Sequence, residues 1–336
     1  MPGVRRINNQ PARLQDALVL HKYLLQLLGC KDLEALSRDL KDPALEGVDD
    51  EGVSRLYYAL KQHLYGSQSV TQEMLFEYDQ NIVRYTNEIN ERRTDKIVWK
   101  YFQYLALLFT EIYLDRYFAN KEELRNHINV FLNDEFNFRP ETWHGIDEFR
   151  DSDMNKLAFW CATGSGKTLM MHINIKQYLH YSEKYHAKPL NRILILTPNE
   201  GLSNQHLRML TQSNFSAELF SKQARGGVFT GKTIEVIDIN KLADTDGDKT
   251  VAVESFEGNN LVLVDEGHKG SGGDVWKGYR NVLTQEGFSF EYSATFGQAI
   301  AAQSGTGRDD LLKEYGKATL FDYSYRYFYN DGYGKD

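Results

Sequence analysis

The segment "KLAFWCATGSGKTLMMHINIKQYL" (residues 156–179) decides the fold, because it contains the three parts of a phosphate-binding loop in order. Residues 157–161 form an apolar run that indicates a buried strand. Gly164 and Gly166 permit a tight turn, and the periodicity after Lys167 predicts a helix. In such a loop the backbone N–H groups, the helix N-terminus and the lysine all face the phosphates. Cys161 stands where the usual pattern has its first glycine, at a strand–loop junction where the backbone need not approach a phosphate closely.

A second segment, "GGVFTGKTIEVIDI" (226–239), matches the formal pattern G-x-x-x-x-G-K-[ST] more closely. Polar "SKQARGG" precedes it, where a phosphate loop needs a strand. The β-branched residues of "TIEVIDI" follow it and predict a second strand, where a phosphate loop needs a helix. We therefore expect Lys232 on a solvated turn and predict that the first segment is the nucleotide site.

From about residue 138 onward, short apolar runs alternate with helical stretches. These runs are "KLAFWCA", "RILILTP", "TIEVIDI", "LVLVDE" and "FSFEYSAT". Runs this continuous indicate strands that are covered on both faces, which is typical of a parallel sheet. The sequence therefore predicts an α/β fold with helices flanking a parallel sheet.

The run "LVLVDEGHKG" (261–270) supplies a second set of candidate functional residues. Its apolar strand ends in Asp265 and Glu266, at the carboxyl end where open α/β sheets place their ligands. Asp265, together with Thr168, is a candidate to hold Mg²⁺, and Glu266 is a candidate to orient and deprotonate the attacking water. An Asp-Glu pair after an apolar strand is common by chance. Its position downstream of Lys167 in an alternating chain favours the functional interpretation.

Residues 1–137 predict helices throughout. The segment "RLQDALVLHKYLLQLLG" (13–29) has one broad apolar face and a glycine at its end. The segment "VWKYFQYLALLFTEIYLDRYFANKEELRNHINVFL" (98–132) lacks Gly and Pro, and we expect one long helix or two abutting ones. This N-terminal region is interpreted as a helical packing or partner-docking domain without a catalytic role.

Composition excludes several classes of protein. No apolar run is long enough to span a membrane, and no apolar core follows the early arginines as in a secretory signal. Cys30 and Cys161 are far apart in sequence and indicate neither a metal site nor a disulfide, so we predict a cytoplasmic location. The net charge is −8 and neither half of the chain is basic, so any nucleic acid must be bound by a local patch or by backbone amides.

Four motifs now stand in the order found in one known group of proteins. They are "ATGSGKT" (162–168), "TPNEGLSNQ" (197–205), "DEGH" (265–268) and "SAT" (293–295). The chain resembles the superfamily 2 helicases and translocases in these motifs I, Ia, II and III. It most resembles the ATPase (Res) subunits of type III restriction enzymes and the related DEAD/DEAH-box helicase family defence proteins. The resemblance covers about 138–300 and implies a RecA-like ATP-binding domain over 138–305.

The resemblance also implies roles for individual residues. ATP and Mg²⁺ would be the cofactors, with Lys167 gripping the β and γ phosphates and Glu266 acting as the base. The residues implied to bind the nucleotide are Thr163, Gly164, Ser165, Gly166, Lys167, Thr168 and Asp265, of which Thr168 and Asp265 serve the metal. His268 directly follows the Asp-Glu pair and is implied in catalysis, and Ser293, Ala294 and Thr295 would couple hydrolysis to the nucleic-acid surface. Thr197, Pro198 and Gln205 would lie along the strand-binding track, where backbone amides contact phosphates.

Two departures from the family pattern bear on function. The stretch "FRPETWHGID" (138–147) lacks the glutamine that reads adenine in many relatives, so specificity for ATP over other triphosphates stays open. The second RecA-like domain of the family, with its arginine finger, is not found in 301–336. We expect 306–336 to begin a linker or insertion toward that domain, in a chain that is the front part of a longer protein.

The tyrosines of "FDYSYRYFYNDGYG" (321–334) alternate on one face of a predicted strand. Nucleic-acid bases could stack on such a row. A strand packed against another part of the protein is the interpretation that we prefer.

The sequence thus predicts a nucleic-acid-dependent ATPase, a helicase or translocase that acts on DNA in a restriction or phage-defence system. RNA is the alternative nucleic acid, a methyltransferase or nuclease subunit is the implied protein partner, and no membrane is expected. Another P-loop ATPase class is one alternative function. A regulatory or assembly module that binds nucleotide without turnover is the other.

Overall fold

The computed structural model describes residues 13–64, 69–136, 146–221, 233–247, 250–266 and 273–334. Its main feature is a seven-stranded sheet of order β3-β4-β2-β7-β8-β1-β9, in which every neighbouring pair is parallel. The strands are β1 (Lys156–Cys161), β2 (Arg192–Thr197), β3 (Ala217–Leu219), β4 (Ile234–Asp238), β7 (Asn260–Asp265), β8 (Phe288–Ser293) and β9 (Thr319–Tyr323). The predicted α/β fold is therefore confirmed, and all five strands predicted from apolar runs are present.

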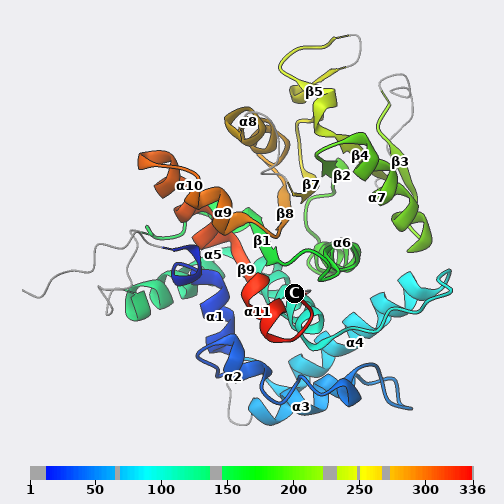
Figure 1. The fold of residues 1–336 in the computed structure, drawn as a ribbon, viewed down its shortest axis with the longest axis vertical. Coiled ribbons are helices and arrows are strands. Elements are labelled where there is room, and N and C mark those ends of the chain that lie inside the picture. Colours follow the sequence, from blue (N-terminus) through cyan, green and yellow to red (C-terminus); the bar gives the residue numbers. More distant parts are fainter. Residues whose placement is uncertain are drawn as a thin grey trace, which may run out of the picture.

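Helices cover both faces of this sheet (Figure 1). On one face lie α6 (Lys167–Lys184) and α7 (Glu200–Gln212), and on the other lie α8 (Gly273–Leu283), α9 (Phe296–Ala301) and α10 (Gly305–Ala318). This division follows from right-handed crossovers, because the chain moves one way along the sheet from β1 through β2 to β3 and the opposite way from β4 through β7 and β8 to β9. The arrangement is RecA-like, as the resemblance implied.

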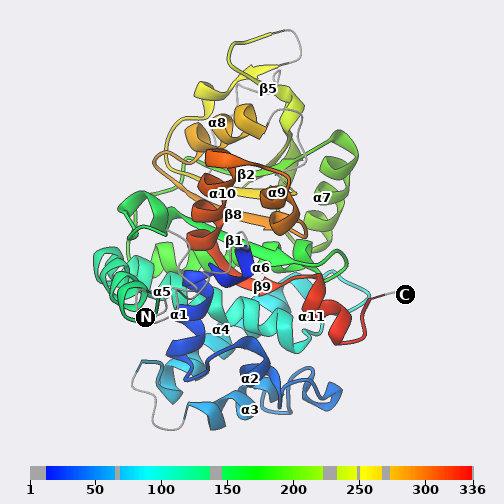
Figure 2. The same cartoon turned by 60° about the vertical axis from the view of Figure 1, so that its left-hand side comes forward.

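The remaining elements are small. A two-stranded sheet of β5 (Leu242–Ala243) and β6 (Val251–Ala252) projects at the end of the molecule opposite to the N-terminal helices (Figure 2). Short 3-10 or π turns cover Leu14–Asp16, Pro43–Leu45, Leu132–Phe136, Asp151–Asn155, Ile239–Lys241 and Val253–Phe256. Within the described residues, no helix has both the length and the apolar character that crossing a membrane requires.

The N-terminal region is all-helical, as predicted. Its helices are α1 (Val19–Leu27), α2 (Leu33–Ser37), α3 (Arg55–His63), α4 (Gln72–Asn90) and α5 (Tyr101–Phe131). The long segment consists of two abutting helices, because Asn120 within α5 has non-helical dihedral angles (φ −160°, ψ 91°). The Asn120 side chain accepts a hydrogen bond from the Glu123 N–H and so caps the second part.

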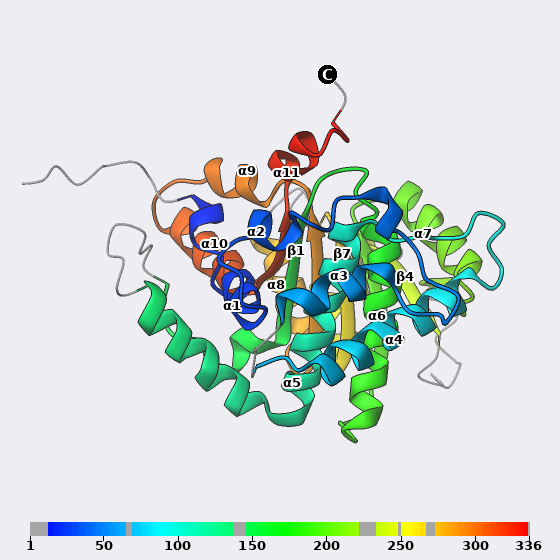
Figure 3. The same cartoon turned by 90° about the horizontal axis from the view of Figure 1, so that it is seen from below.

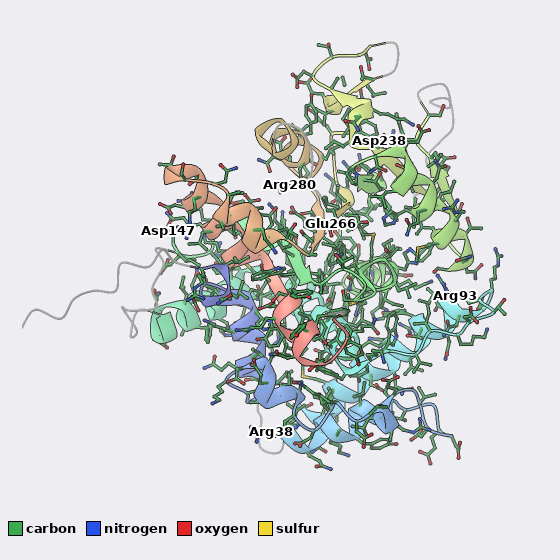
Figure 4. All side chains as sticks on the ribbon, viewed as in Figure 1. Arg38, Arg93, Asp147, Asp238, Glu266 and Arg280 are labelled. Carbon is green, nitrogen blue, oxygen red and sulfur yellow. The ribbon has the colours of Figure 1, made fainter. Side chains whose placement is uncertain are left out.

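These N-terminal helices pack directly on the sheet and share its core. One cluster of buried apolar side chains extends from Leu14 through α1, α4 and α5 to Tyr323 on β9. The Phe102 ring of α5 stacks on the Tyr323 ring at a centroid distance of 3.8 Å. Arg93 lies just beyond the end of α4 (Figure 4) and donates a hydrogen bond of 2.7 Å to Ser213, the residue after α7. The helical region thus packs on the edge strand β9 and also reaches the end of α7, which packs on β3 and β4.

A buried polar network crosses the contact between the N-terminal helices and α6. The Glu111 carboxylate of α5 accepts hydrogen bonds from Tyr181 Oη (2.6 Å), Gln177 Nε2 (2.7 Å) and Asn81 Nδ2 (3.0 Å). Glu111 is fully buried, and this burial raises the pKa of its carboxyl to about 7 although the three donors lower it. The network is therefore sensitive to pH near neutrality.

The network continues to the strand that carries the 293–295 motif. Asn174 Nδ2 donates to Gln177 Oε1 (2.7 Å), and Tyr292 Oη donates to Asn174 Oδ1 (2.6 Å). Tyr292 is the penultimate residue of β8. Buried hydrogen bonds thus link α5 to the carboxyl end of β8.

The described part of the segment expected to begin a linker or insertion, 306–334, consists largely of regular elements. Most of it belongs to α10 and to β9, which pairs with β1 at the edge of the sheet. The expected strand of alternating tyrosines is wrong beyond Tyr323, since Tyr325–Asn330 form the helix α11. A spacing of two residues also brings every second pair to the i, i+4 spacing of a helix, as in Tyr325 and Tyr329, whose rings lie 6.0 Å apart. The tyrosine spacing therefore fits both a strand and a helix. In the folded chain α11 lies at the same edge of the molecule as α9 (Figure 3).

Candidate nucleotide site

The phosphate-loop segment has the strand–turn–helix geometry that the sequence predicted. β1 ends at Cys161 and α6 begins at Lys167. Between them Gly164 (φ 85°) and Gly166 (φ 88°) adopt left-handed backbone conformations that favour glycine. The Gly166 carbonyl starts the helix by accepting hydrogen bonds from the N–H groups of Leu169 and Met170. The helix N-terminus therefore points toward the turn, as anion binding requires.

Cys161 is part of the core and has no redox or nucleophilic environment. It is fully buried, and burial raises the pKa of its thiol to about 12. The thiol is therefore neutral and packs as a small apolar group. Its carbonyl oxygen accepts a hydrogen bond of 3.2 Å from Lys167 Nζ, so this position supports the loop through its backbone.

Glu266 lies in the middle of the molecule, at the end of β7 (Figure 4). Its Oε1 atom is 3.0 Å from Lys167 Nζ. Its N–H donates a hydrogen bond to the Tyr292 carbonyl (2.9 Å) on β8. The φ of Glu266 is 54°, a conformation that non-glycine residues adopt at a cost and that is found most often at functional sites. The two candidate residues separated by about 100 positions in sequence are thus in direct contact.

The 293–295 motif contacts the same carboxylate. Ser293 Oγ donates to Glu266 Oε2 (3.2 Å), and the Ala294 N–H donates to Glu266 Oε1 (3.4 Å). The Thr295 N–H donates to Ser293 Oγ (2.9 Å), which orders the turn before α9. The base candidate, the loop lysine and this motif therefore form one hydrogen-bonded cluster at the carboxyl ends of β1, β7 and β8.

Asp265 has a partner that the sequence did not indicate. His206 Nε2 lies 2.9 Å from Asp265 Oδ2, and the His206 side chain is buried in α7. His206 directly follows Gln205, the last residue of the 197–205 motif. This adjacency in sequence does not specify that the His206 side of α7 is turned toward Asp265.

The three residues predicted along the nucleic-acid track differ in their exposure and in their hydrogen bonds. Thr197 is buried, and its hydroxyl lies 2.6 Å from Ser203 Oγ, so it supports the start of α7. The Pro198 carbonyl accepts a hydrogen bond from Asn240 Nδ2 (3.3 Å). Of these three residues, only Gln205, on α7, is exposed.

Some predicted positions lie outside the described residues. They are His268, Lys232 and the pair Arg139-Pro140. The flank of the second Gly-Lys-Thr segment is described, and β4 begins at Ile234 directly after Thr233. A strand follows that segment, as predicted, whereas a phosphate loop requires a helix.

Mg²⁺ is the metal that the resemblance implies, and the donors present are of the type it uses. Among the described residues, no group of three His, Cys, Asp or Glu side chains could hold a metal ion alone. Mg²⁺ in nucleotide sites is usually held by one or two protein ligands together with water and substrate phosphates. The Asp265 carboxylate and the Thr168 hydroxyl, in the first turn of α6, are hard oxygen donors that fit this pattern.

Residues 135–298 match the family described as "Type III restriction enzyme, res subunit". The matched range is just under half of the chain and contains all four motifs. It confirms the resemblance to Res-type helicase-like ATPases. No curated protein matches the chain.

Proposed function

We propose that this chain, whose 135–298 segment is a helicase-like ATPase domain of the Res type, is a nucleic-acid-dependent helicase or translocase. Its proposed substrate is DNA, and its proposed setting is a restriction or phage-defence system with a methyltransferase or nuclease partner. The observation that carries the proposal is the cluster of Lys167, Glu266 and Ser293, in which the loop lysine and the 293–295 motif hold the same carboxylate. Such a cluster connects the proposed base for hydrolysis, Glu266, to the 293–295 motif, which could respond to bound nucleic acid.

In this proposal the phosphate loop binds the triphosphate through the backbone of residues 163–168 and the N-terminus of α6. Thr168 and Asp265 would hold Mg²⁺, which when bound would supply positive charge against the phosphate oxygens. Lys167 now pairs with Glu266 and with the Cys161 carbonyl. A bound phosphate would compete for the same ammonium group. Glu266 would then be released from this ion pair and could accept a proton from the attacking water.

The proposed coupling runs through Ser293. Its hydroxyl donates to Glu266 and accepts from the Thr295 N–H, so a shift of the turn at 294–295 must change the position of the carboxylate. Nucleic acid bound near α7 or α9 would act on hydrolysis by this route. His268, next to the Asp-Glu pair in sequence, is proposed to take part in the same coupling.

The test is steady-state hydrolysis of ATP by the full-length enzyme that includes this chain, without DNA and with single-stranded or double-stranded DNA. The proposal expects stimulation by DNA that is lost in Glu266→Gln. Turnover that is indifferent to nucleic acid would favour another P-loop ATPase class. Binding of Mg-ATP without turnover under every condition would favour a regulatory or assembly module. RNA in place of DNA distinguishes the two nucleic acids.

A further inference from the structure

The phosphate loop is held by a side chain from the N-terminal helices, outside the segment that matches the family. Gln103 lies in the first turn of α5, and its Nε2 donates a hydrogen bond of 2.8 Å to the carbonyl oxygen of Ser165. Ser165 is at the centre of the loop and is buried. The contact joins positions 62 residues apart in sequence.

The orientation of the Gln103 side-chain amide is determined by two partners, one a hydrogen-bond donor and the other an acceptor. Gln103 Oε1 accepts a hydrogen bond of 3.0 Å from the Lys100 N–H, which caps α5. The nitrogen must therefore face the Ser165 carbonyl, because a reversed amide would bring two acceptors and two donors together. Lys100 is in turn paired with Glu46 (3.1 Å), and the neighbouring Tyr101 donates to Asp331. The start of α5 is thus anchored from both sides.

The approach of Gln103 depends on a glycine in the loop. A Cβ atom added to Gly166 would lie 2.4 Å from Gln103 Nε2, closer than side chains allow. The positive φ of Gly166 independently favours glycine. Glycine at position 166 therefore permits both the left-handed backbone of the loop and the close approach of Gln103 from α5.

Holding the Ser165 carbonyl has a consequence for the next N–H group. The peptide between Ser165 and Gly166 is planar and trans, so its C=O and N–H point in opposite directions. A carbonyl held toward α5 turns the Gly166 N–H away from α5. The Ser165 hydroxyl is buried without a hydrogen-bond partner among the described residues, so it does not orient this peptide. Phosphate loops bind phosphate oxygens through N–H groups of this kind.

We propose that Gln103 is a positioning residue for the bound nucleotide: it orients the Ser165–Gly166 peptide so that the loop N–H groups are ready for the phosphates. The N-terminal helices are then part of the ATPase site and are more than a packing or docking unit. This inference rests on the proposed function, since it assumes that the loop binds a nucleoside triphosphate. In this role Gln103 affects binding of the phosphates, whichever nucleobase the nucleotide carries.

The test uses two variants that remove the donor in different ways. Gln103→Glu keeps the oxygen that caps α5 and replaces only the donor nitrogen, while adding a charge. Gln103→Met adds no charge and keeps the length of the side chain, while losing the cap. Gln26→Ala, at an exposed position of α1, is the matched control. Binding of Mg-ADP is measured by titration well below the melting temperature, which is itself measured for each protein without nucleotide.

We expect both Gln103 variants to bind Mg-ADP more weakly than the parent chain. A neutral hydrogen bond corresponds to about threefold to tenfold in affinity, and the added charge of Gln103→Glu makes its loss larger. The KM for ATP should rise in parallel while kcat changes less, because the contact supports phosphate binding equally in the ground state and in the transition state. Parental affinity for Mg-ADP in either variant would overturn the inference. Failure of the parent chain to bind Mg-ADP would instead overturn the proposed function.

Discussion

Replacing the buried Glu111 by glutamine should change how the stability of the protein depends on pH. Burial raises the pKa of this carboxyl from 4.5 to about 7. A pKa that is raised on folding stabilises the protein fully below about pH 4.5, and this contribution is lost as the pH rises through about 7. Each pKa unit corresponds to about 1.4 kcal/mol, so the contribution of Glu111 amounts to about 3 kcal/mol.

Glu111→Gln places a neutral amide where the parent protein has a carboxyl that ionises. The free energy of unfolding of the parent, minus that of the variant, should therefore fall by about 3 kcal/mol between pH 4.5 and pH 8. Urea unfolding of both proteins across this range measures the difference, in which other titrating groups cancel. Glu122→Gln is the control, since Glu122 is an exposed glutamate in the second part of α5, and its difference should stay flat.

A flat difference for Glu111→Gln would refute the reasoning. It would mean that the donors Tyr181, Gln177 and Asn81 keep the carboxylate ionised throughout the range and that burial does not dominate. The same experiment tests whether the contact between the N-terminal helices and α6 unfolds together with the sheet, because a separately unfolding helical region would give two transitions.

Three further predictions concern the nucleotide site. Lys167→Ala should abolish binding of Mg-ATP while Lys232→Ala leaves the affinity near the parental value, and equal losses in a titration would contradict the choice of loop. Glu266→Gln should retain Mg-ATP but stop hydrolysis, because the amide keeps the shape and loses the base, and turnover at the parental rate would exclude Glu266 as the base. His206→Ala should raise the Mg²⁺ concentration needed for half-maximal nucleotide binding by about tenfold or more, since residues that orient a metal ligand typically contribute this much. An unchanged Mg²⁺ titration would show that Asp265 needs no such support.

Much of the sheet and its nucleotide loop could be predicted because their signals are local. A continuous apolar run indicates a buried strand, and the turn with Gly164 and Gly166 lies between such a run and a helical pattern. Asp265 and Glu266 follow another buried strand, and parallel strands bring their carboxyl ends to one edge. The sequence therefore predicts that Lys167 and Glu266 lie at the same edge of the sheet, but it does not predict the ion pair between their side chains.

The misses share a different physical cause. The tyrosine pattern after residue 321 fits a strand and a helix, and only the pairing of β9 with β1 determines where the strand stops. His206 contacts Asp265 because of the way α7 packs over β2, β3 and β4, which no spacing within the motif specifies. Interactions of this kind depend on side chains from several elements that meet only after folding.

The sequence by itself determined the elements that follow from chain-local periodicity: the buried strands and the strand–turn–helix order around the loop between β1 and α6. Only the tertiary structure decided that the N-terminal helices share the core of the sheet and that Gln103 reaches the phosphate loop. The physical reason is distance along the chain. A hydrogen bond between residues 62 positions apart leaves no periodic trace in either segment, and it exists only because α5 and α6 bury their apolar faces against each other.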